Sequence, residues 1–122
     1  MKALFNRDCE LAGWMDDRHE HIFDTDMSWV AYIRNGHAWS ANSGNWCGPV
    51  NDLNCLDRDG KVVGWNPSKH IQGSVKPVTP VRAVRAIRPV RPVRPVRPVR
   101  PIRPVTPLCG WSLSSFSEWI NQ

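Results

Sequence analysis

The sequence predicts an all-β fold in which four repeated β-hairpins are arranged around a pseudo-four-fold axis as a small barrel-like assembly. The first observation is an internal repeat at residues 4–15, 22–33, 38–50 and 55–66, whose starts lie 18, 16 and 17 residues apart. The second is the pattern inside each copy, where two apolar residues precede a polar stretch and a run rich in Val, Leu, Trp or Tyr follows it. Such a short unit cannot bury its own apolar face, so the four copies must share one core.

Each copy is typical of a strand, a tight turn and a second strand. Residues 57–60 show the turn most clearly, because Asp suits the entry of a turn and Gly60 suits a positive φ in a bulged loop. Residues 6–8, 24–26 and 40–42 repeat this chemistry. Their paired polar residues also resemble calcium ligands, but a calcium loop needs about six oxygens. Recurrence in phase with the hairpins favours turn chemistry.

One repeat position holds a small residue before an aromatic one in three copies: Gly13, Ala31 and Gly64. We expect these residues to allow close approach of strands near the axis, so Gly64→Val should destabilise more than Gly36→Val. The third copy has a one-residue insertion and carries Gly48-Pro49 instead of the small-aromatic pair. Its outer strand is therefore expected to end early.

Three segments are expected. Residues 1–70 form the four-hairpin domain, called the head below, and residues 71–108 form a tail. Residues 109–122 form an aromatic C-terminal segment with a short helix that packs on the head, because Ser115 and Glu118 fit a capping box. Charge is divided unevenly: residues 1–75 hold 7 Lys/Arg and 10 Asp/Glu, and residues 76–122 hold 9 and 1, so −3 and +8 give the total of +5.

The tail is a triplet repeat. Between residues 75 and 107, eleven triplets each hold an apolar residue, then Arg, Lys or Thr, then Pro or Ala. Regular proline forbids an α-helix and favours polyproline II, whose three residues per turn align Val/Ile, Arg and Pro in separate columns. At ~3.1 Å per residue, such a semi-rigid rod would extend about 100 Å. The candidate binding cations are Arg82, Arg85, Arg88, Arg91, Arg94, Arg97, Arg100 and Arg103.

No catalytic constellation, metal site or cofactor site is predicted. His19 and His21 would bind a metal only with help from acidic neighbours, and a solvated loop is the favoured interpretation. Cys9 is a poor nucleophile candidate, because it lies in a turn beside Asp8 and Glu10, which would raise its pKa. The four cysteines show no C-x-x-C pairing and are expected to be free thiols.

The cellular location is predicted from the absence of two kinds of apolar segment, a signal-peptide core and a membrane-spanning stretch. The first eight residues become polar before an apolar signal core forms, and the longest apolar run, residues 29–33, is far shorter than the ~20 residues of a membrane-spanning helix. We expect a cytoplasmic protein, with any membrane association being peripheral.

The chain also resembles a known family. The aromatic-Asn/Asp hairpins, the Gly-Trp pairs at 13–14 and 64–65, the proline tract and the aromatic segment at 111–119 are similar to the bacterial four-fold β-flower proteins. The resemblance covers nearly the whole chain and implies a flower-like set of four β-hairpins. It further implies a structural kinship with Tubby-like lipid-binding domains. It implies no activity and supplies no catalytic residues.

Together these features predict a non-enzymatic binding module, with an apolar and aromatic head and a cationic tail that engage an anionic membrane surface or lipid. Four head aromatics are expected to be structural or to line a ligand surface: Trp14, Tyr32, Trp46 and Trp65. The alternative is a scaffolding protein whose Pro-rich tail binds protein partners or self-associates. A simple spacer remains open, as does the oligomeric state. Nucleic acid is less favoured, because the tail lacks aromatic residues for base stacking.

Overall fold

A computed structural model describes residues 1–74, 78–80, 86–93, 95, 98, 100–101, 106–107 and 109–122. Eight strands follow the four repeats in order, and one short helix, α1 (Phe116–Ile120), lies near the C-terminus. The strands are β1 (Lys2–Phe5), β2 (Leu11–Met15), β3 (His21–Phe23), β4 (Trp29–Arg34), β5 (His37–Ser40), β6 (Trp46–Asn51), β7 (Asn54–Leu56) and β8 (Val62–Gly64).

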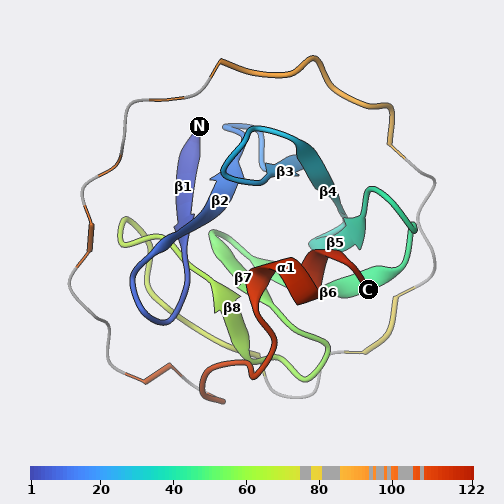
Figure 1. Cartoon of the computed structure of the whole chain (residues 1–122). Helices are drawn as coiled ribbons and strands as arrows, with labels where there is room; N and C mark the ends of the chain where they lie inside the picture. Colours follow the sequence, from blue (N-terminus) through green and yellow to red (C-terminus); the bar gives the residue numbers. More distant parts are fainter. Residues whose placement is uncertain are drawn as a thin grey trace.

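The strands form a nearly closed antiparallel barrel. Each strand pairs with its neighbours in sequence, in the order β1 to β8. An antiparallel bridge then joins the two ends, where the Phe5 N–H donates to the Trp65 carbonyl at 2.8 Å and the Trp65 N–H donates back at 3.0 Å. Figure 1 shows the resulting ring of four hairpins. The predicted all-β fold of four hairpins, with its short C-terminal helix, is confirmed.

The four hairpins share one register. Their matching cross-strand pairs are Leu4 with Gly13, Ile22 with Ala31, Ala38 with Gly48, and Cys55 with Gly64. A register shift follows each of these pairs on the first strand. Equivalent residues of the repeat therefore occupy equivalent places around the axis, which allows one hairpin to be compared directly with the next.

The expectation that the third hairpin ends early is wrong. Strand β6 runs from Trp46 to Asn51 and includes Pro49, which lies opposite His37. Gly48 takes the small-residue position, opposite Ala38. The inserted residue is accommodated in the turn, because the Ser40 N–H donates to Asn45, whereas the Asn6 N–H of the first hairpin donates to Glu10. The third turn is thus one residue longer, and the strand after it keeps its length.

Side-chain oxygens of the first turn residue close the hairpin turns. Asn6 Oδ1 accepts the N–H groups of Asp8 and Glu10 at 2.9 and 3.0 Å. Asp24 does the same for residues 26 and 28, and Asp57 does so for residues 59 and 61. These bonds explain why Asn or Asp recurs in phase with the hairpins, and they support turn chemistry as the role of these residues.

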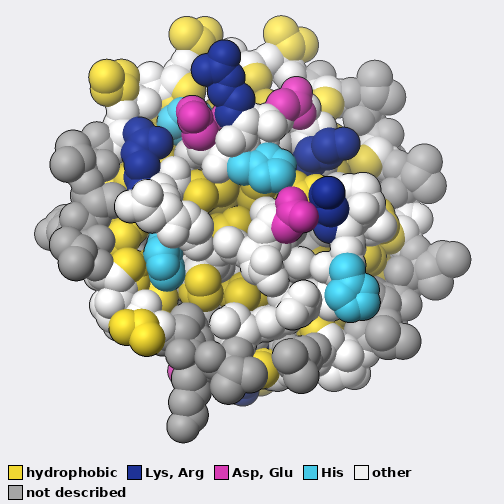
Figure 2. Space-filling model, turned by 180° about the vertical axis from the view of Figure 1, so that it is seen from behind, with side chains coloured by type: hydrophobic (Ala, Val, Ile, Leu, Met, Phe, Trp, Pro, Cys, Tyr) yellow, Lys and Arg dark blue, Asp and Glu magenta, His cyan; other side chains and the backbone are white. Residues whose placement is uncertain are grey.

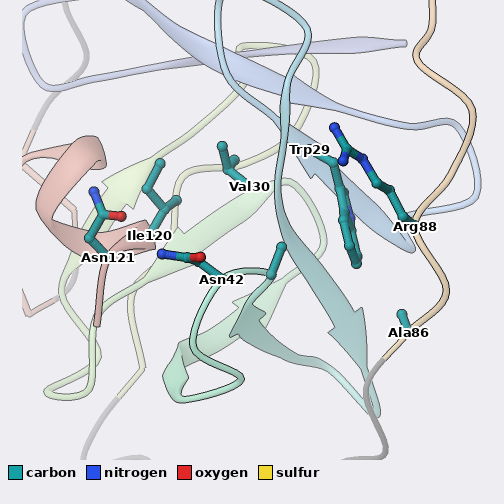
Figure 3. Close-up of a pocket in the computed structure, with 8 residues that line it drawn as sticks. Trp29, Val30, Asn42, Ala86, Arg88, Ile120 and Asn121 are labelled. Atoms are coloured by element: carbon teal, nitrogen blue, oxygen red, sulfur yellow. The ribbon is translucent and has the colours of Figure 1, made fainter.

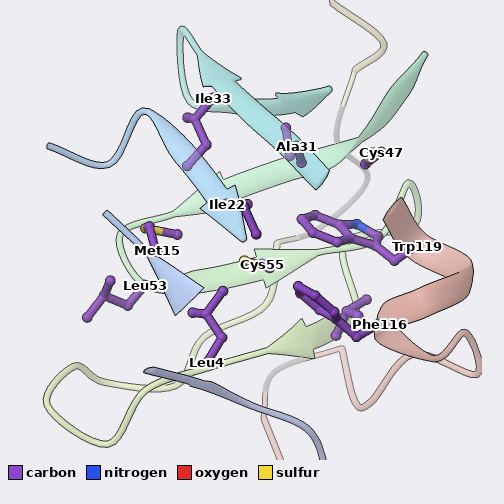
Figure 4. Close-up of a cluster of buried hydrophobic side chains, with 12 residues drawn as sticks. Leu4, Met15, Ile22, Ala31, Ile33, Cys47, Leu53, Cys55, Phe116 and Trp119 are labelled. Atoms are coloured by element: carbon purple, nitrogen blue, oxygen red, sulfur yellow. The ribbon is translucent and has the colours of Figure 1, made fainter. Parts of the chain in front are cut away.

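The barrel interior is filled from both ends of the chain. Leu4, Ile22 and Cys55 of the hairpins pack in one cluster with Phe116 and Trp119 of α1. Figure 4 shows these two aromatic side chains pointing from α1 into the strands, and Figure 1 shows α1 crossing the centre of the ring. Ser115 and Glu118 form the capping box that begins this helix. The helix therefore closes the core that the hairpins leave open.

Close approach occurs at Gly13 and Gly48 rather than at Gly64. A Cβ on Gly13 would lie 2.5 Å from the Phe23 carbonyl oxygen, and a Cβ on Gly48 would lie 2.0 Å from that of Leu56. At Gly64 the nearest atom would be 3.6 Å away, which is ordinary contact. Gly36 has a φ of +76° that disfavours any side chain. The reason given for the larger effect of Gly64→Val is therefore wrong.

The described residues of the tail lie against the head instead of projecting from it. Figure 1 shows residues 86–93 and the other described tail residues lying outside the ring of four hairpins. These residues belong to neither helix nor strand. Backbone bonds hold both ends of the tail at the fourth hairpin, from the Ser74 N–H to Gly60 at 2.9 Å and from the Val62 N–H to Gly110 at 3.2 Å. The predicted rod therefore contacts the barrel wherever its proline column is described.

Candidate functional site

The three columns of the tail have different surroundings. None of the described residues of the Pro/Ala column is exposed, and Ala86 and Pro107 are buried. In the Val/Ile column, Val78, Ile87, Val90 and Val93 are 82–92% exposed. The described arginines, Arg88, Arg91 and Arg100, are exposed as well. The triplet period therefore places proline against the head and displays aliphatic and cationic side chains outward.

Pro89 is seated on the second hairpin. It lines a small pocket together with Phe23, Met27 and Trp29. Two residues further along, the Arg91 guanidinium donates through Nη2 to the backbone carbonyl oxygen of Asp26 at 2.6 Å. This carbonyl belongs to the hairpin turn, so one Pro-x-Arg unit contacts both the apolar wall and the tip of the hairpin.

The first hairpin binds the tail in the same way. Pro98 lines a pocket with Phe5, Cys9 and Leu11. Arg100 Nη2 donates to the carbonyl oxygen of Asp8 at 3.1 Å. Because Leu4 and Ile22 occupy matching positions, each of these head residues is the repeat equivalent of its counterpart in the second hairpin. The two tail units lie nine residues apart, so three triplets separate equivalent sites.

A third contact lies between the second and third hairpins. Ala86 packs with Tyr32, Trp39 and Trp46 in one buried cluster. Ala86 and Arg88 also line a cavity of about 530 Å³ beside the C-terminal segment. Its other lining residues are Trp29, Val30, Ala41, Asn42, Ile120 and Asn121. Figure 3 shows that the tail, β4 and the end of α1 meet around this space, with the Arg88 side chain at its edge.

Apolar side chains protrude from the tail along residues 86–93. Residues 86–93 form the upper edge in Figure 1, and the same edge in Figure 2 carries hydrophobic side chains that stand out from the surface. Ile87, Val90 and Val93 are the exposed aliphatic residues of this edge, with Arg88 and Arg91 between them. We call residues 86–93 the rim. Figure 2 also shows His, Lys, Arg, Asp and Glu side chains scattered over the face opposite α1.

The predicted site residues are only partly brought together. Arg88, Arg91 and Arg100 lie on the tail around the head, whereas Arg82, Arg85, Arg94, Arg97 and Arg103 fall outside the described residues. The four head aromatics are all buried: Trp14, Tyr32, Trp46 and Trp65. Of the two roles predicted for them, structural or ligand-lining, this burial is compatible with the structural one. Tyr32 and Trp46 contact Ala86, and the Trp65 indole N–H donates to the Asn6 carbonyl at 3.0 Å.

Sequence reasoning missed the second apolar layer. Phe5, Phe23 and Trp65 are buried together in one cluster, which is separate from the interior cluster that contains Leu4 and Trp119. The available signal was the excess of aromatics, since seven tryptophans in a chain of this size exceed what one small interior can hold. A second buried layer requires a cover, and the proline column is the part of the chain long enough to provide it.

Asp16, Glu20 and His21 are one group whose side-chain ligand atoms lie within 4.8 Å of one another. Asp16 Oδ1 already accepts the backbone N–H groups of Glu20 and His21 at 2.7 and 3.0 Å. The group is therefore explained by a loop turn that connects two hairpins. His19, the other histidine singled out from the sequence, has a φ of 55° in this turn and is not a member of the group.

The buried thiols are poorly suited to nucleophilic chemistry. Burial raises the pKa of the Cys47 thiol to about 12, although nearby Arg58 opposes the shift. Burial also raises the pKa of Cys55, and Cys47 adds to that effect. All four cysteines are free, and Cys109 is exposed. Since the thiolate is the reactive species, Cys47 and Cys55 stay protonated and inert near neutral pH.

The geometry defines a class of repeat protein: a nearly closed barrel of four β-hairpins whose outer surface is contacted by the described prolines of its own triplet tail. A sequence model of the 4-fold beta flower protein family matches residues 2–120, so the chain belongs to this family. The match includes the tail and α1 as well as the hairpins. No curated protein and no solved structure matched the chain in these comparisons. The kinship with Tubby-like domains stays a prediction.

Within the part of the chain that the structure describes, no helix has the length and apolar character needed to cross a bilayer.

Proposed function

We propose that this protein is a non-enzymatic binding module that attaches to anionic membrane surfaces through the rim. The observation that carries the proposal is the alternation of protruding aliphatic residues and arginines along residues 86–93. Ile87, Val90 and Val93 are each more than 90% exposed, and Arg88 and Arg91 lie between them. Exposed aliphatic residues on a convex edge are unfavourable in water and are favourable at a lipid interface.

Two energetic contributions support the membrane as the partner. An anionic leaflet attracts each nearby Lys or Arg by about 1 kcal/mol, and the tail region from residue 76 onward has a net charge of +8. Full burial of one Val or Ile side chain contributes roughly 1.5–3 kcal/mol. The charge attracts the protein from a distance, and the aliphatic side chains add short-range adhesion that salt does not screen.

The arrangement of the tail also suits this role. The proline column holds the backbone against the hairpins, so the outward columns are displayed without a further ordering step. Arg91 donates one of its N–H groups to the Asp26 carbonyl, and the guanidinium has other N–H groups that can contact lipid phosphates. A preordered edge loses less conformational entropy on binding than a free polyproline chain would.

Vesicle binding tests this function. The protein should bind vesicles containing phosphatidylserine more strongly than neutral phosphatidylcholine vesicles, and the difference should shrink over a salt series. The triple variant Ile87→Ser, Val90→Ser, Val93→Ser should bind at least about tenfold more weakly, because it loses more than one aliphatic contribution. Leu113→Ser is the matched control, since Leu113 is 90% exposed but lies in the C-terminal segment.

The outcomes separate the membrane from other partners. Equal binding to both kinds of vesicle, or unchanged binding of the triple variant, would contradict the proposal. Single-stranded and duplex nucleic acids are measured in parallel, and binding to them with no binding to vesicles would assign the arginines to a different polyanion. Loss of self-association in the triple variant, with vesicle binding absent from the start, would favour the scaffolding alternative.

A further inference from the structure

We propose that the outer surface of the hairpins is a binding site for Pro-x-Arg repeats, and that it accepts the tail of a second copy of this chain in place of its own. The inference is independent of membrane binding, because it uses the inward proline column and the turn carbonyls. The exposed Val/Ile column takes no part in it. The petal site is defined here as the first-hairpin residues Phe5, Asp8, Cys9 and Leu11, together with their repeat equivalents.

The first argument is that the petal site recurs with its ligand. In the second hairpin, Pro89 lies against Phe23, Met27 and Trp29, and Arg91 bonds the Asp26 carbonyl. In the first hairpin, Pro98 and Arg100 make the equivalent contacts. Two independent segments of tail thus meet two copies of one surface in the same way. A repeated geometry of this kind indicates recognition of a motif rather than accidental packing.

The second argument is that the triplet period of the tail matches the spacing of the petal sites on the head. The seated prolines are nine residues apart, which is about 28 Å in an extended chain with ~3.1 Å per residue. A spacing of three whole triplets keeps the same column facing the head at each petal site. A ligand whose prolines and arginines fell out of this register would place aliphatic or cationic side chains in the apolar pocket. The head therefore selects the order of the residues as well as their charge.

The third argument is the chemistry of the covered layer. Trp39 and Trp46, which pack with Ala86, are almost completely buried, and their indole N–H groups have no acceptor in the described part of the chain. Aromatic grooves that present indole donors are a common way to bind polyproline II segments, whose backbone carbonyls are not used internally. The layer thus has the apolar aromatic walls on which such a ligand packs, while the resident tail leaves these two indole N–H groups without an acceptor among the described residues.

A second copy is the occupant that the chain itself specifies. Its tail carries the same Pro-x-Arg units, and the net charge of +8 beyond residue 75 is attracted to the charge of −3 on the residues before it. Exchange of an identical segment between two copies restores each contact that it breaks, so its free-energy cost is small. The covalent link gives the resident tail an advantage equivalent to a concentration in the millimolar range for a short flexible connection. Exchange should therefore become visible when the resident contacts are weakened.

The test uses the full-length protein and a fluorescent peptide with the sequence of residues 86–101. Arg91→Gln combined with Arg100→Gln removes both bonds from the tail to the hairpin turns. We expect the peptide to bind this double variant at least tenfold more tightly than the wild-type protein, because the resident tail competes less. Val93→Ser is the control, since Val93 belongs to the same tail segment, is 92% exposed and lines neither petal pocket. That variant should bind the peptide as the wild type does.

A scrambled peptide of the same composition tests register. It should bind the double variant at least tenfold more weakly than the native peptide. Equal binding of the two peptides would overturn the proposal in favour of charge attraction alone, and equal binding of the native peptide to wild type and double variant would overturn the role of the two arginine contacts. Should the double variant fail to fold by circular dichroism, the wild-type protein is titrated with millimolar peptide, and unchanged indole N–H resonances would refute the site.

Exchange between whole chains is measured with two fluorophore-labelled preparations of the double variant. Mixing them should produce energy transfer that rises with protein concentration and falls when excess unlabelled native peptide is added. The absence of transfer at concentrations where the peptide binds would show that the petal sites accept such repeats but that a second copy does not supply them.

Discussion

The indole N–H of Trp119 donates to the carbonyl oxygen of Leu56 at 2.8 Å, inside the barrel. This bond joins two residues 63 positions apart and connects α1 to the fourth hairpin. The tail begins and ends at the same hairpin, through Ser74 with Gly60 and Gly110 with Val62. The fourth hairpin therefore holds both ends of the tail and the helix that closes the core, which couples the whole C-terminal half of the chain to the stability of the head.

Replacement of Trp119 is expected to destabilise the entire protein. Trp119 is fully buried in the interior cluster, so Trp119→Ala should lower the free energy of unfolding by about 3–5 kcal/mol. Urea denaturation measures the change. Trp119→Phe keeps most of the apolar volume but leaves the Leu56 carbonyl unpaired, so it should have a smaller effect. A loss below about 1 kcal/mol for Trp119→Ala would mean that α1 is not part of the core.

The glycines of the shared repeat position should respond differently to alanine. Gly13→Ala would place a Cβ 2.5 Å from the Phe23 carbonyl oxygen and 2.9 Å from the Phe116 ring. The overpacking should cost about 1–3 kcal/mol of stability. Gly64→Ala meets its nearest neighbour at 3.6 Å and should change stability by less than about 1 kcal/mol. Thermal melting of both variants checks this, and equal shifts in melting temperature would contradict the close approach at Gly13.

The hairpins could be predicted from the sequence because the residues that determine each turn lie within that turn. Asn6, Asp24 and Asp57 recur with the repeat, and each closes its own turn through neighbouring backbone N–H groups. The course of the third hairpin was not predictable, because the inserted residue lengthened the turn and left β6 intact. Gly48 and Pro49 alone could not distinguish a terminated strand from one that passes close to a carbonyl oxygen.

The path of the tail was harder to predict. The triplets define three columns, but nothing local specifies which column faces the head. That choice depends on pockets built from distant residues, such as Phe23 and Met27 around Pro89. Tyr32 and Trp46 depend on a similar long-range contact, because both pack with Ala86 of the tail. Composition identified these aromatics as important, and only the three-dimensional arrangement shows that the tail, neighbouring strands and the aromatics form one layered structure.

Asp57 should contribute more stability than its repeat equivalent Asp24. Both side chains accept two turn N–H groups through Oδ1, but Asp57 Oδ2 also accepts the Ser112 hydroxyl at 2.6 Å. Asp57→Ala should therefore be more destabilising than Asp24→Ala by about 1 kcal/mol or more. In a Ser112→Ala background the difference should nearly vanish. A double-mutant cycle by chemical denaturation measures it, and an undiminished difference would show that the Ser112 contact is not its source.

Stability should fall at alkaline pH because of the buried Cys47 thiol. Burial raises the pKa of Cys47 from 9.0 to about 12 in the folded protein. Between these values the native state binds more protons than the unfolded state, so the free energy of unfolding decreases as pH rises above about 9. The decrease due to this thiol is at most about 1.4 kcal/mol per pH unit and ends near the folded pKa.

Denaturant titrations from pH 8 to 11 should show that the free energy of unfolding depends less steeply on pH for Cys47→Ala than for wild type. Cys109→Ala is the control, because Cys109 is exposed and its removal should leave the slope unchanged. Identical slopes for wild type and Cys47→Ala would show that this thiol is not held protonated by burial.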